Sequence, residues 1–234
     1  MHLRFVPGFS QPAAVWDGVV AALPPAPREE AVALEVPDGL DAARTVAALG
    51  DAGGVGCYVG YSMGGRLVLR LALDRPERVE ALVLVSTSPG IDDETERTAR
   101  RAADGALAAD VERDGAKVFL ERWLAQPIFA TLSASAAMLD ARADAMSEAR
   151  LTHQLRVLGQ GAMPSCWDRL EDLDVPVLLL TGDVDPKYTA LAQEMFERIE
   201  DCMVLTLPGG HALPLECPGA VAEAITAFLH DCTA

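Results

Sequence analysis

The sequence predicts one α/β domain with a mostly parallel, doubly wound sheet and a helical segment inserted into it. Short apolar runs alternate with amphipathic helical segments on both sides of residues 92–164, the pattern of parallel strands joined by helices. The stretch 92–164 is rich in Ala, Arg, Asp and Glu and shows helical periodicity without a convincing strand. With 234 residues, 50% of them hydrophobic, the chain suits one substantial core. We expect a single domain over 1–234, with 92–164 as a helical cap within it.

Turn residues set the expected boundaries of the elements. Pro7 and Gly8 end the first strand, and the prolines at 24, 25 and 27 close the first helix. The apolar run at 55–61 suits a strand buried on both faces of a parallel sheet, because such strands read as continuous hydrophobic stretches. The expected strands are 3–6, 31–36, 55–61, 79–85, 175–181 and 203–207. The expected helices outside the cap are 15–23, 40–49, a helix directly after residue 62, 191–199 and 220–229.

Charge excludes several classes of partner. The formal net charge is −16, so the mean field repels the phosphate backbone of nucleic acid and anionic membrane surfaces. No run approaches the roughly 20 apolar residues that span a bilayer, and the apolar stretch at the start is too short for a signal peptide. We therefore expect a cytoplasmic protein that binds neither nucleic acid nor membranes. A local basic pocket for a small anion remains compatible with an acidic surface.

Cysteine and histidine usage offers no metal site. The chain has 5 cysteines, which are scattered and lack a C-x-x-C pair, so they read as reduced thiols of a reducing compartment. The 4 histidines show no H-E-x-x-H or other ligand spacing. We expect no metal centre.

The segment from Gly60 to Gly65 carries the strongest chemical signal. Its G-x-S-x-G pattern places Ser62 between the strand at 55–61 and a helical pattern, which is the context of a nucleophile elbow. On such a turn the hydroxyl points out of the sheet, and the Met63 N–H at the helix N-terminus can stabilise a developing oxyanion.

A histidine and an acid are placed to complete a triad. A serine hydroxyl needs an imidazole within hydrogen-bond reach and a carboxylate to orient that ring. His211 follows the last predicted strand, and Asp183 and Asp185 both follow the strand before it, where strand ends converge on a site. The spacing alone leaves the choice between the two aspartates open. The order serine, acid, histidine is that of the α/β-hydrolase fold.

Several segments together resemble the 2-succinyl-6-hydroxy-2,4-cyclohexadiene-1-carboxylate synthases of menaquinone biosynthesis, within the α/β-hydrolase superfamily. The elbow has tyrosine before the serine and arginine after the second glycine, as in those synthases. The Ser-Thr-Ser-Pro-Gly run at 86–90, the segments 96–104 and 119–129, and the stretches 159–164 and 182–188 with Lys187 also fit. The elbow is typical of the superfamily, whereas the other features are more specific to the synthases.

The resemblance implies a catalytic triad of Ser62, Asp185 and His211, because the family places its acid at the second aspartate. The second oxyanion donor would be the Phe9 backbone N–H, in the loop after the first strand. Pro7 stands where most relatives have histidine, a change that a backbone donor would survive. The antiparallel hairpin that often opens this fold is apparently absent, so the strand at 3–6 should lie close to a sheet edge, where pairing between copies is conceivable.

The resemblance also implies a lyase reaction without a metal or organic cofactor. The synthases eliminate pyruvate from a polyanionic cyclohexene, and here the triad would start the elimination by abstracting a proton. Arginine binds carboxylates bidentately, so Arg66, Arg100 and Arg142 are the expected substrate ligands, with Tyr61 and Trp123 completing the pocket. Arg66 should stand at the exposed start of its helix. The segment around Arg142 needs a one-residue shift to match, so Arg150 or Arg156 could be its counterpart, and Trp123 could instead pack the cap.

Two other readings remain. A serine hydrolase acting on a small ester, thioester or carbon–carbon bond would use the same triad for acyl transfer. A binding protein on this scaffold would be expected to have lost a triad member. The sequence predicts a monomer or a weak homo-oligomer with an anionic small-molecule substrate.

Overall fold

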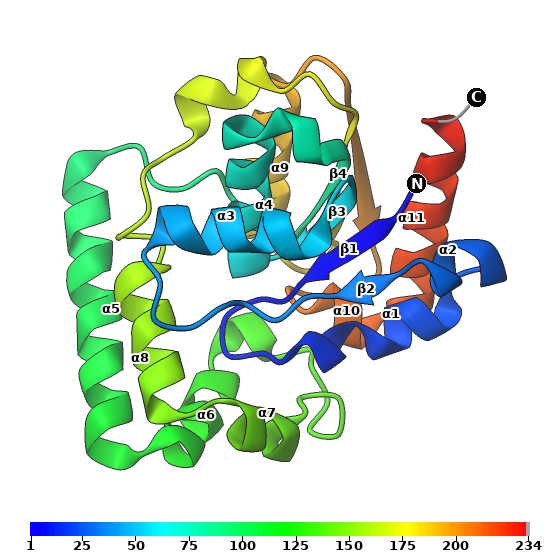
Figure 1. The fold of residues 1–234 in the computed structure, drawn as a ribbon. Helices are drawn as coiled ribbons and strands as arrows, with labels where there is room; N and C mark the ends of the chain where they lie inside the picture. The colour runs from blue at the N-terminus through cyan, green and yellow to red at the C-terminus, as the bar shows by residue number, and fades with distance from the viewer. Residues whose placement is uncertain (233–234) are drawn as a thin grey trace.

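A computed structural model describes residues 1–232 and shows a parallel sheet between two layers of helices (Figure 1). The six strands are ordered β2-β1-β3-β4-β5-β6, and every pair is parallel. They span β1 Leu3–Val6, β2 Val32–Ala33, β3 Gly56–Tyr61, β4 Val79–Val85, β5 Val177–Gly182 and β6 Cys202–Leu207. The α/β prediction is confirmed, and the described part of the chain contains no opening antiparallel hairpin.

A different set of helices covers each face of the sheet. The α-helices are α1 Asp17–Ala22, α2 Pro25–Glu29, α3 Ala42–Gly53, α4 Met63–Asp74, α5 Glu94–Asp114, α6 Ala116–Leu124, α7 Leu139–Ala145, α8 Glu148–Val157, α9 Pro186–Phe196, α10 Leu213–Glu216 and α11 Pro218–Asp231. Short 3₁₀ helices are Ala13–Trp16, Pro76–Arg78, Pro127–Phe129 and Trp167–Asp172. Helices α3, α4 and α9 pack on one face, and α1 and α11 pack on the other.

Alternation along the central strands separates the two cores. Tyr58, Leu82 and Leu84 face the helices α3, α4 and α9, whereas Val59 and Val83 face α1 and α11. Successive side chains of a strand point to opposite faces, so strands covered on both faces must be apolar throughout. The run at 55–61 has this property because β3 is buried along its whole length.

Helices α5 to α8 stand between β4 and β5 in the chain and lie at one end of the sheet, away from both termini (Figure 1). They have a small core of their own, centred on Ala108, Val111, Phe119, Leu120 and Leu151. The strand arrows point toward these helices, so the carboxyl ends of the strands face them. This is the end of a parallel sheet at which ligands bind.

The second predicted strand, 31–36, is wrong in length. Only Val32 and Ala33 pair with β1, followed by one further bond from the Leu34 N–H to the Phe5 carbonyl. Beyond that point Glu35 accepts from the Ala13 N–H at 2.8 Å and from Arg150 at 2.8 Å. The segment is therefore held by contacts of the Glu35 side chain with other elements and not by the sheet. Strand β1 lies second in the sheet, inside this short edge strand.

Two helix boundaries also differ from the predictions. The helix expected at 15–23 starts as a 3₁₀ turn, and only Asp17–Ala22 is α-helical. The helix expected at 191–199 is α9, which starts earlier because Asp185 caps it through the Tyr188 N–H and Pro186 occupies its first turn.

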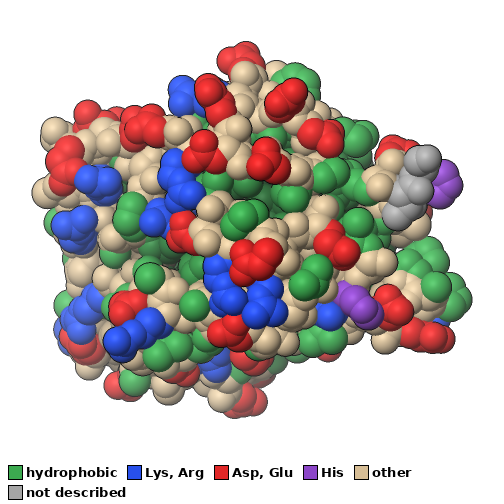
Figure 2. Space-filling view, turned by 45° about the horizontal axis from the view of Figure 1, so that its top comes forward, with side chains coloured by type: hydrophobic (Ala, Val, Ile, Leu, Met, Phe, Trp, Pro, Cys, Tyr) green, Lys and Arg blue, Asp and Glu red, His purple; other side chains and the backbone are tan. Residues whose placement is uncertain are grey.

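The acidic side chains of the surface lie among basic ones. On the face shown in Figure 2, Lys and Arg side chains are interspersed with Asp and Glu. None of the helices within residues 1–232 is long and apolar enough to cross a membrane. The 5 cysteines are free thiols, two of them buried.

Helix α4 approaches β1 closely at Gly64. A Cβ at this position would lie against the carbonyl oxygen of Val6 and 2.5 Å from that of Pro7. Backbone atoms cannot move aside as a flexible side chain can, so only glycine fits here. The contact sets how near the start of α4 lies to the loop after β1.

We predict that Gly64→Ala lowers the free energy of unfolding by about 1–3 kcal/mol or more, because the added methyl group overpacks a backbone contact. Gly105→Ala is the matched control. Gly105 lies in the middle of α5, and a Cβ there would have no atom of another element within 4 Å. That variant should gain about 0.5–1 kcal/mol from helix propensity. Urea unfolding followed by circular dichroism measures both. Equal stabilities of the two variants would contradict the packing argument.

Candidate active site

Ser62 stands on a strained turn between β3 and α4. Its backbone has φ 51° and ψ −109°, a conformation that side-chain-bearing residues rarely adopt. The turn is held by two hydrogen bonds: the Ser62 N–H donates to the Val85 carbonyl at 2.9 Å, and the Thr87 hydroxyl donates to the Ser62 carbonyl at 2.7 Å. The last residue of β4 and the segment just after it therefore support the strained residue from the side, as a nucleophile elbow requires.

A continuous hydrogen-bonded chain joins Ser62, His211 and Asp185. The Ser62 Oγ lies 3.1 Å from Nε2 of His211, and Nδ1 of His211 lies 2.8 Å from Oδ2 of Asp185. His211 and Asp185 are 4% and 6% exposed, so their contact is shielded from water. An ionised carboxylate can only accept, so Nδ1 carries the proton and Nε2 can accept from the Ser62 hydroxyl. This is the geometry of a serine activated by an oriented imidazole.

The two candidate aspartates have different partners. Asp185 contacts the His211 ring, whereas Asp183 is exposed and its Oδ1 accepts from the Gly209 N–H at 3.0 Å. The geometry therefore brings Asp185 to His211 and leaves Asp183 on the backbone of the neighbouring loop.

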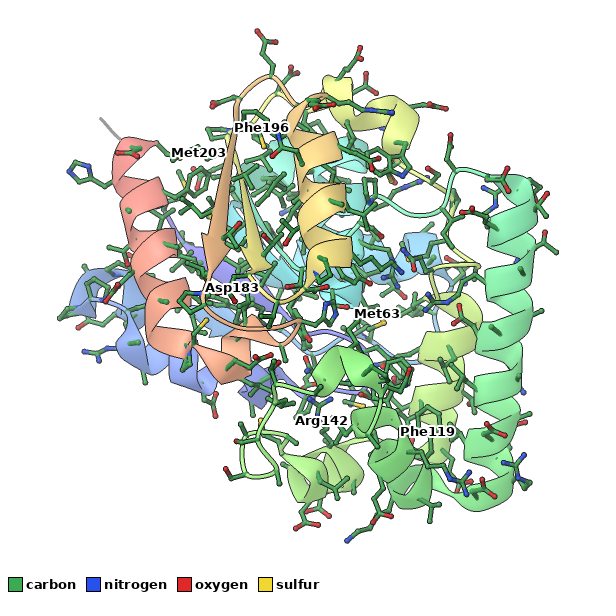
Figure 3. All side chains as sticks on the ribbon, turned by 180° about the vertical axis from the view of Figure 1, so that it is seen from behind. Met63, Phe119, Arg142, Asp183, Phe196 and Met203 are labelled. Atoms are coloured by element: carbon green, nitrogen blue, oxygen red, sulfur yellow. The ribbon has the colours of Figure 1, made fainter. Side chains whose placement is uncertain are left out.

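Both predicted oxyanion residues border Ser62. Met63 is the first residue of α4, and the first N–H groups of a helix have no intrahelical acceptor. Phe9 lies in the loop after β1 and lines the same cavity as Met63 and Ser62. Figure 3 shows Met63 at the end of the sheet that faces the helices carrying Phe119 and Arg142.

The loop after β1 is held by two glutamines that the sequence analysis did not single out. The Gly8 N–H donates to Oε1 of Gln11 at 3.2 Å, and the Ser10 N–H donates to Oε1 of Gln154 at 3.0 Å. Gln154 belongs to α8, so one of the inserted helices supports the backbone next to Phe9. Gln154 gives no local sequence signal for its contact, because its partner Ser10 is far away in the chain.

A cavity of about 450 Å³ opens beside Ser62. Its wall combines strand ends with the inserted helices, and includes Ser62, His211, Tyr61, Arg66, Arg100 and Trp123. Aromatic rings surround the imidazole: the ring centroid of Tyr188 lies 4.4 Å from that of His211, and the centroid of Tyr61 lies 5.5 Å away. Burial raises the pKa of both phenols, so at neutral pH they are uncharged hydrogen-bonding groups.

Arg66 is half-buried, in contrast to the exposed position predicted for it. Its Nη2 donates to the Leu158 carbonyl at 3.0 Å, because the segment after α8 folds over the start of α4. Its Nε is buried and, within residues 1–232, has no hydrogen-bond partner. Burial lowers the pKa of the Arg66 guanidinium to about 10, so it stays positively charged at neutral pH.

Arg100 borders the same cavity from α5. Its Nε donates to Oδ1 of the buried Asp104 at 2.8 Å, and its Nη1 donates to Oε1 of Gln160 at 2.9 Å. These two contacts hold the guanidinium at the cavity wall. Lys187 also lines the cavity, and its ammonium lies 5.6 Å from the centroid of the Tyr188 ring.

Arg142 is not brought to the cavity wall. It is 1% exposed, and its guanidinium donates to the Ala137 carbonyl at 2.8 Å and to the Ser10 hydroxyl at 3.1 Å. Its two sequence alternatives also lie elsewhere, with Arg150 bonded to Glu35 and Arg156 bonded to Glu112. In this structure Arg142 therefore ties α7 to the loop after β1.

Trp123 both packs and lines the cavity. Its ring centroid lies 4.9 Å from that of Phe9 and 6.0 Å from that of Phe129. The indole Nε1 is buried without a hydrogen-bond partner in the described chain.

No group of three or more His, Cys, Asp and Glu side chains within the described range is arranged to hold a metal ion. The carboxylates and imidazole near Ser62 are engaged with each other or with backbone N–H groups.

Comparison with known proteins identifies the family. Residues 5–224 match the model of the alpha/beta hydrolase family. The chain belongs to this family. A relative from Bacillus subtilis, provisionally named a 2-succinyl-6-hydroxy-2,4-cyclohexadiene-1-carboxylate synthase, is 36% identical over 176 residues, which cover 73% of this chain and 64% of the relative. The synthase of that name from Citrobacter koseri is 32% identical over 173 residues, covering 73% of this chain and 67% of the relative.

Solved structures agree on the fold. MenH from S. aureus superimposes with a TM-score of 0.92 at 24% identity, covering 100% of this chain and 95% of that one. A thermophilic esterase from Thermogutta terrifontis gives a TM-score of 0.73 at 19% identity, covering 100% of this chain and 91% of that one. The chain spans 64% of the Bacillus relative's length, a little under two thirds. The resemblance seen in the motifs is thus confirmed across most of the sequence.

The strain at Ser62 yields a stability prediction. We expect Ser62→Gly to have a free energy of unfolding about 1 kcal/mol higher than Ser62→Ala, because glycine adopts positive φ without strain and alanine does not. Both variants lack the hydroxyl, so the comparison isolates the backbone. Denaturant unfolding measures the difference, and a glycine variant no more stable than the alanine variant would count against a strained turn.

Proposed function

We propose that the protein is a carbon–oxygen lyase that eliminates pyruvate from 2-succinyl-5-enolpyruvyl-6-hydroxy-3-cyclohexene-1-carboxylate to give 2-succinyl-6-hydroxy-2,4-cyclohexadiene-1-carboxylate. The observation that carries the proposal is the presence of an activated serine and a half-buried guanidinium in one cavity: Ser62 is bonded to His211, and Arg66 lines the same wall with its Nε unpaired in the described chain. The names of the synthase relatives give the product, and the substrate is the one that the resemblance to this family implies.

In the proposed reaction Ser62 acts as a base. His211 accepts the hydroxyl proton at Nε2, and the ring stays oriented by Asp185 at Nδ1. The serine oxygen then removes a proton from a ring carbon of the substrate. The electrons of that C–H bond form a double bond to the neighbouring ring carbon, the existing ring double bond shifts by one carbon, and the ether C–O bond breaks to release the enolate of pyruvate. That enolate takes up a proton at carbon to become pyruvate, so the proton removed from the ring is balanced. Serine forms no acyl-enzyme on this route.

Charge complementarity supports an anionic substrate. Arg66, Arg100 and Lys187 line the cavity. Guanidinium groups form bidentate pairs with carboxylates, and such pairs strengthen where water is excluded. Oxyanion stabilisation by the Met63 and Phe9 N–H groups would act on negative charge that develops during the elimination.

We further propose that residues 92–164 form a cap within a single domain covering 1–234. Helices α5, α6 and α8 each contribute to the cavity wall, through Arg100, Trp123 and Gln154 respectively. The cap would exclude water from the reacting atoms. We also propose that the protein is cytoplasmic, works without an organic cofactor or metal, and is a monomer or a weak homo-oligomer. The five free thiols support a reducing compartment.

A serine hydrolase is the second candidate, because the same hydrogen-bonded chain fits acyl transfer. The arginines at the cavity wall favour the lyase, since a neutral acyl chain has no use for them. The two activities separate experimentally: a hydrolase turns over p-nitrophenyl esters quickly with the burst of an acyl-enzyme, whereas the lyase turns them over slowly at best.

The decisive measurement is pyruvate release from freshly generated substrate, detected with a coupled dehydrogenase. Wild type should release pyruvate well above the spontaneous rate, and Ser62→Ala should lose on the order of 10³-fold or more in kcat because the base is gone. Arg66→Ala should lose on the order of 10²-fold in kcat/KM, the cost of removing a buried charge-assisted contact.

Arg70→Ala is the control for the arginine. It removes the same type of side chain one turn further along α4, where Arg70 is bonded to Asp74 outside the catalytic cavity. Release by Arg70→Ala should match that of wild type. A folded wild type that releases pyruvate only at the background rate would exclude the lyase and favour the hydrolase.

A further inference from the structure

The backbone around His211 is bound by the carboxylate of Glu216. Oε2 of Glu216 accepts from the Gly210 N–H at 2.7 Å, and Oε1 accepts from the Ala212 N–H at 2.9 Å. The residues before and after His211 are thus tied to the two oxygens of one side chain. Hydrogen bonds to an ionised carboxylate are shorter and about twice as strong as neutral ones.

This loop needs external support. It has two glycines directly before His211, and Gly209 has φ 145°, a conformation that side-chain-bearing residues rarely adopt. Glycine has the largest conformational freedom to lose on folding and has no side chain to pack. The direction of the His211 ring therefore depends on contacts that fix the backbone on both sides of it.

Glu216 is itself well anchored. It ends the short helix α10, whose first residue Leu213 is fully buried, and its own N–H donates to the Ala212 carbonyl at 3.0 Å. The side chain therefore returns from a fixed position to the loop that precedes the helix.

A helix-capping role accounts for only half of this geometry. A glutamate near a helix start commonly accepts from the N–H of the capping residue, which here is Ala212. The second contact, to Gly210, lies outside the helix on the other side of His211. Stabilising α10 does not require it.

We infer that Glu216 is a positioning residue, which sets the distance from His211 to Ser62 by clamping the N–H groups on both sides of the histidine. The inference rests on the proposed role of His211, and it holds whether the serine acts as base or nucleophile. Asp185 orients the ring at Nδ1, while Glu216 holds the backbone from which the ring extends. Two carboxylates thus share the placement of one imidazole.

The test compares Glu216→Gln and Glu216→Ala with wild type. The glutamine keeps the volume and one acceptor, but it turns an NH₂ group toward one of the two N–H donors. The alanine removes both acceptors. A displacement of about 1 Å in a catalytic group costs on the order of 10²-fold in rate. We expect kcat for pyruvate release to fall on the order of 10-fold in Glu216→Gln and 10²-fold in Glu216→Ala, with KM unchanged within about twofold.

Glu223→Gln is the matched control, because it removes the same charge from an exposed site on α11. It should leave kcat and KM at their wild-type values. A drop in kcat alone, in variants that melt within a few degrees of wild type, identifies positioning. Wild-type kcat in both Glu216 variants overturns the inference. A lower melting temperature together with a KM changed by more than about twofold also overturns it, because that result would indicate a structural role.

A second readout does not depend on the substrate. The rate at which a fluorophosphonate labels Ser62, followed by mass spectrometry, depends on His211 acting on the serine hydroxyl. The labelling rate should fall in the same order, wild type above Glu216→Gln above Glu216→Ala. If wild type releases no pyruvate but the labelling rates keep this order, the lyase proposal fails and the role of Glu216 stands. Equal labelling rates in all three proteins overturn the role of Glu216 whatever the substrate.

Discussion

The strained turn at Ser62 is the constraint on which the rest of the site depends. Residues with a side chain avoid this backbone conformation, so the surrounding structure must enforce it. Val85 at the end of β4 accepts from the Ser62 N–H, and Thr87 just after the strand donates to the Ser62 carbonyl. Gly64 allows α4 to lie against the carbonyl of Val6. The strain thus has its origin in a tightly packed parallel sheet. In exchange the hydroxyl is presented at the mouth of a cavity and next to the N-terminus of a helix.

His211, unlike Ser62, is positioned by side-chain hydrogen bonds and not by a packed strand and helix. No packed helix or strand carries His211, which lies on a glycine-containing loop between β6 and α10. Carboxylates compensate for this freedom: Asp185 at the ring, Asp183 at Gly209 and Glu216 around the histidine. Some of the acidic side chains of this chain therefore lie at the site, where their carboxylates accept hydrogen bonds from backbone N–H groups. The remaining acidic side chains are mixed with basic ones on the face shown in Figure 2.

The inserted helices do more than cover the cavity. Gln154 accepts from the Ser10 N–H, and Arg142 donates to the Ser10 hydroxyl. Helices α8 and α7 are therefore both hydrogen-bonded to the loop that carries Phe9. Ser10 has φ 61°, a further strained position in this loop. The contacts of Gln11 and Gln154 thus support the backbone of this loop from both sides of Phe9. Movement of these helices would consequently change the loop after β1 as well as access to Ser62.

The sequence by itself determined the sheet, the elbow and the triad candidates. Short apolar runs bounded by turn residues and alternating with helical segments favour strands buried on both faces, and a serine between glycines at the end of such a run predicts the turn. Tertiary structure decided what local patterns leave open. Asp183 and Asp185 follow the same strand, and only the path of the β6–α10 loop shows which one meets the imidazole. Arg66 and Arg142 are both cationic side chains that the sequence does not distinguish. Arg66 borders the cavity, whereas Arg142 donates to the Ser10 hydroxyl, because the partners of each lie far away in the chain. Glu216 is an ordinary surface-type residue in the sequence. Its two bonds around His211 exist only because a four-residue helix turns the chain back on itself.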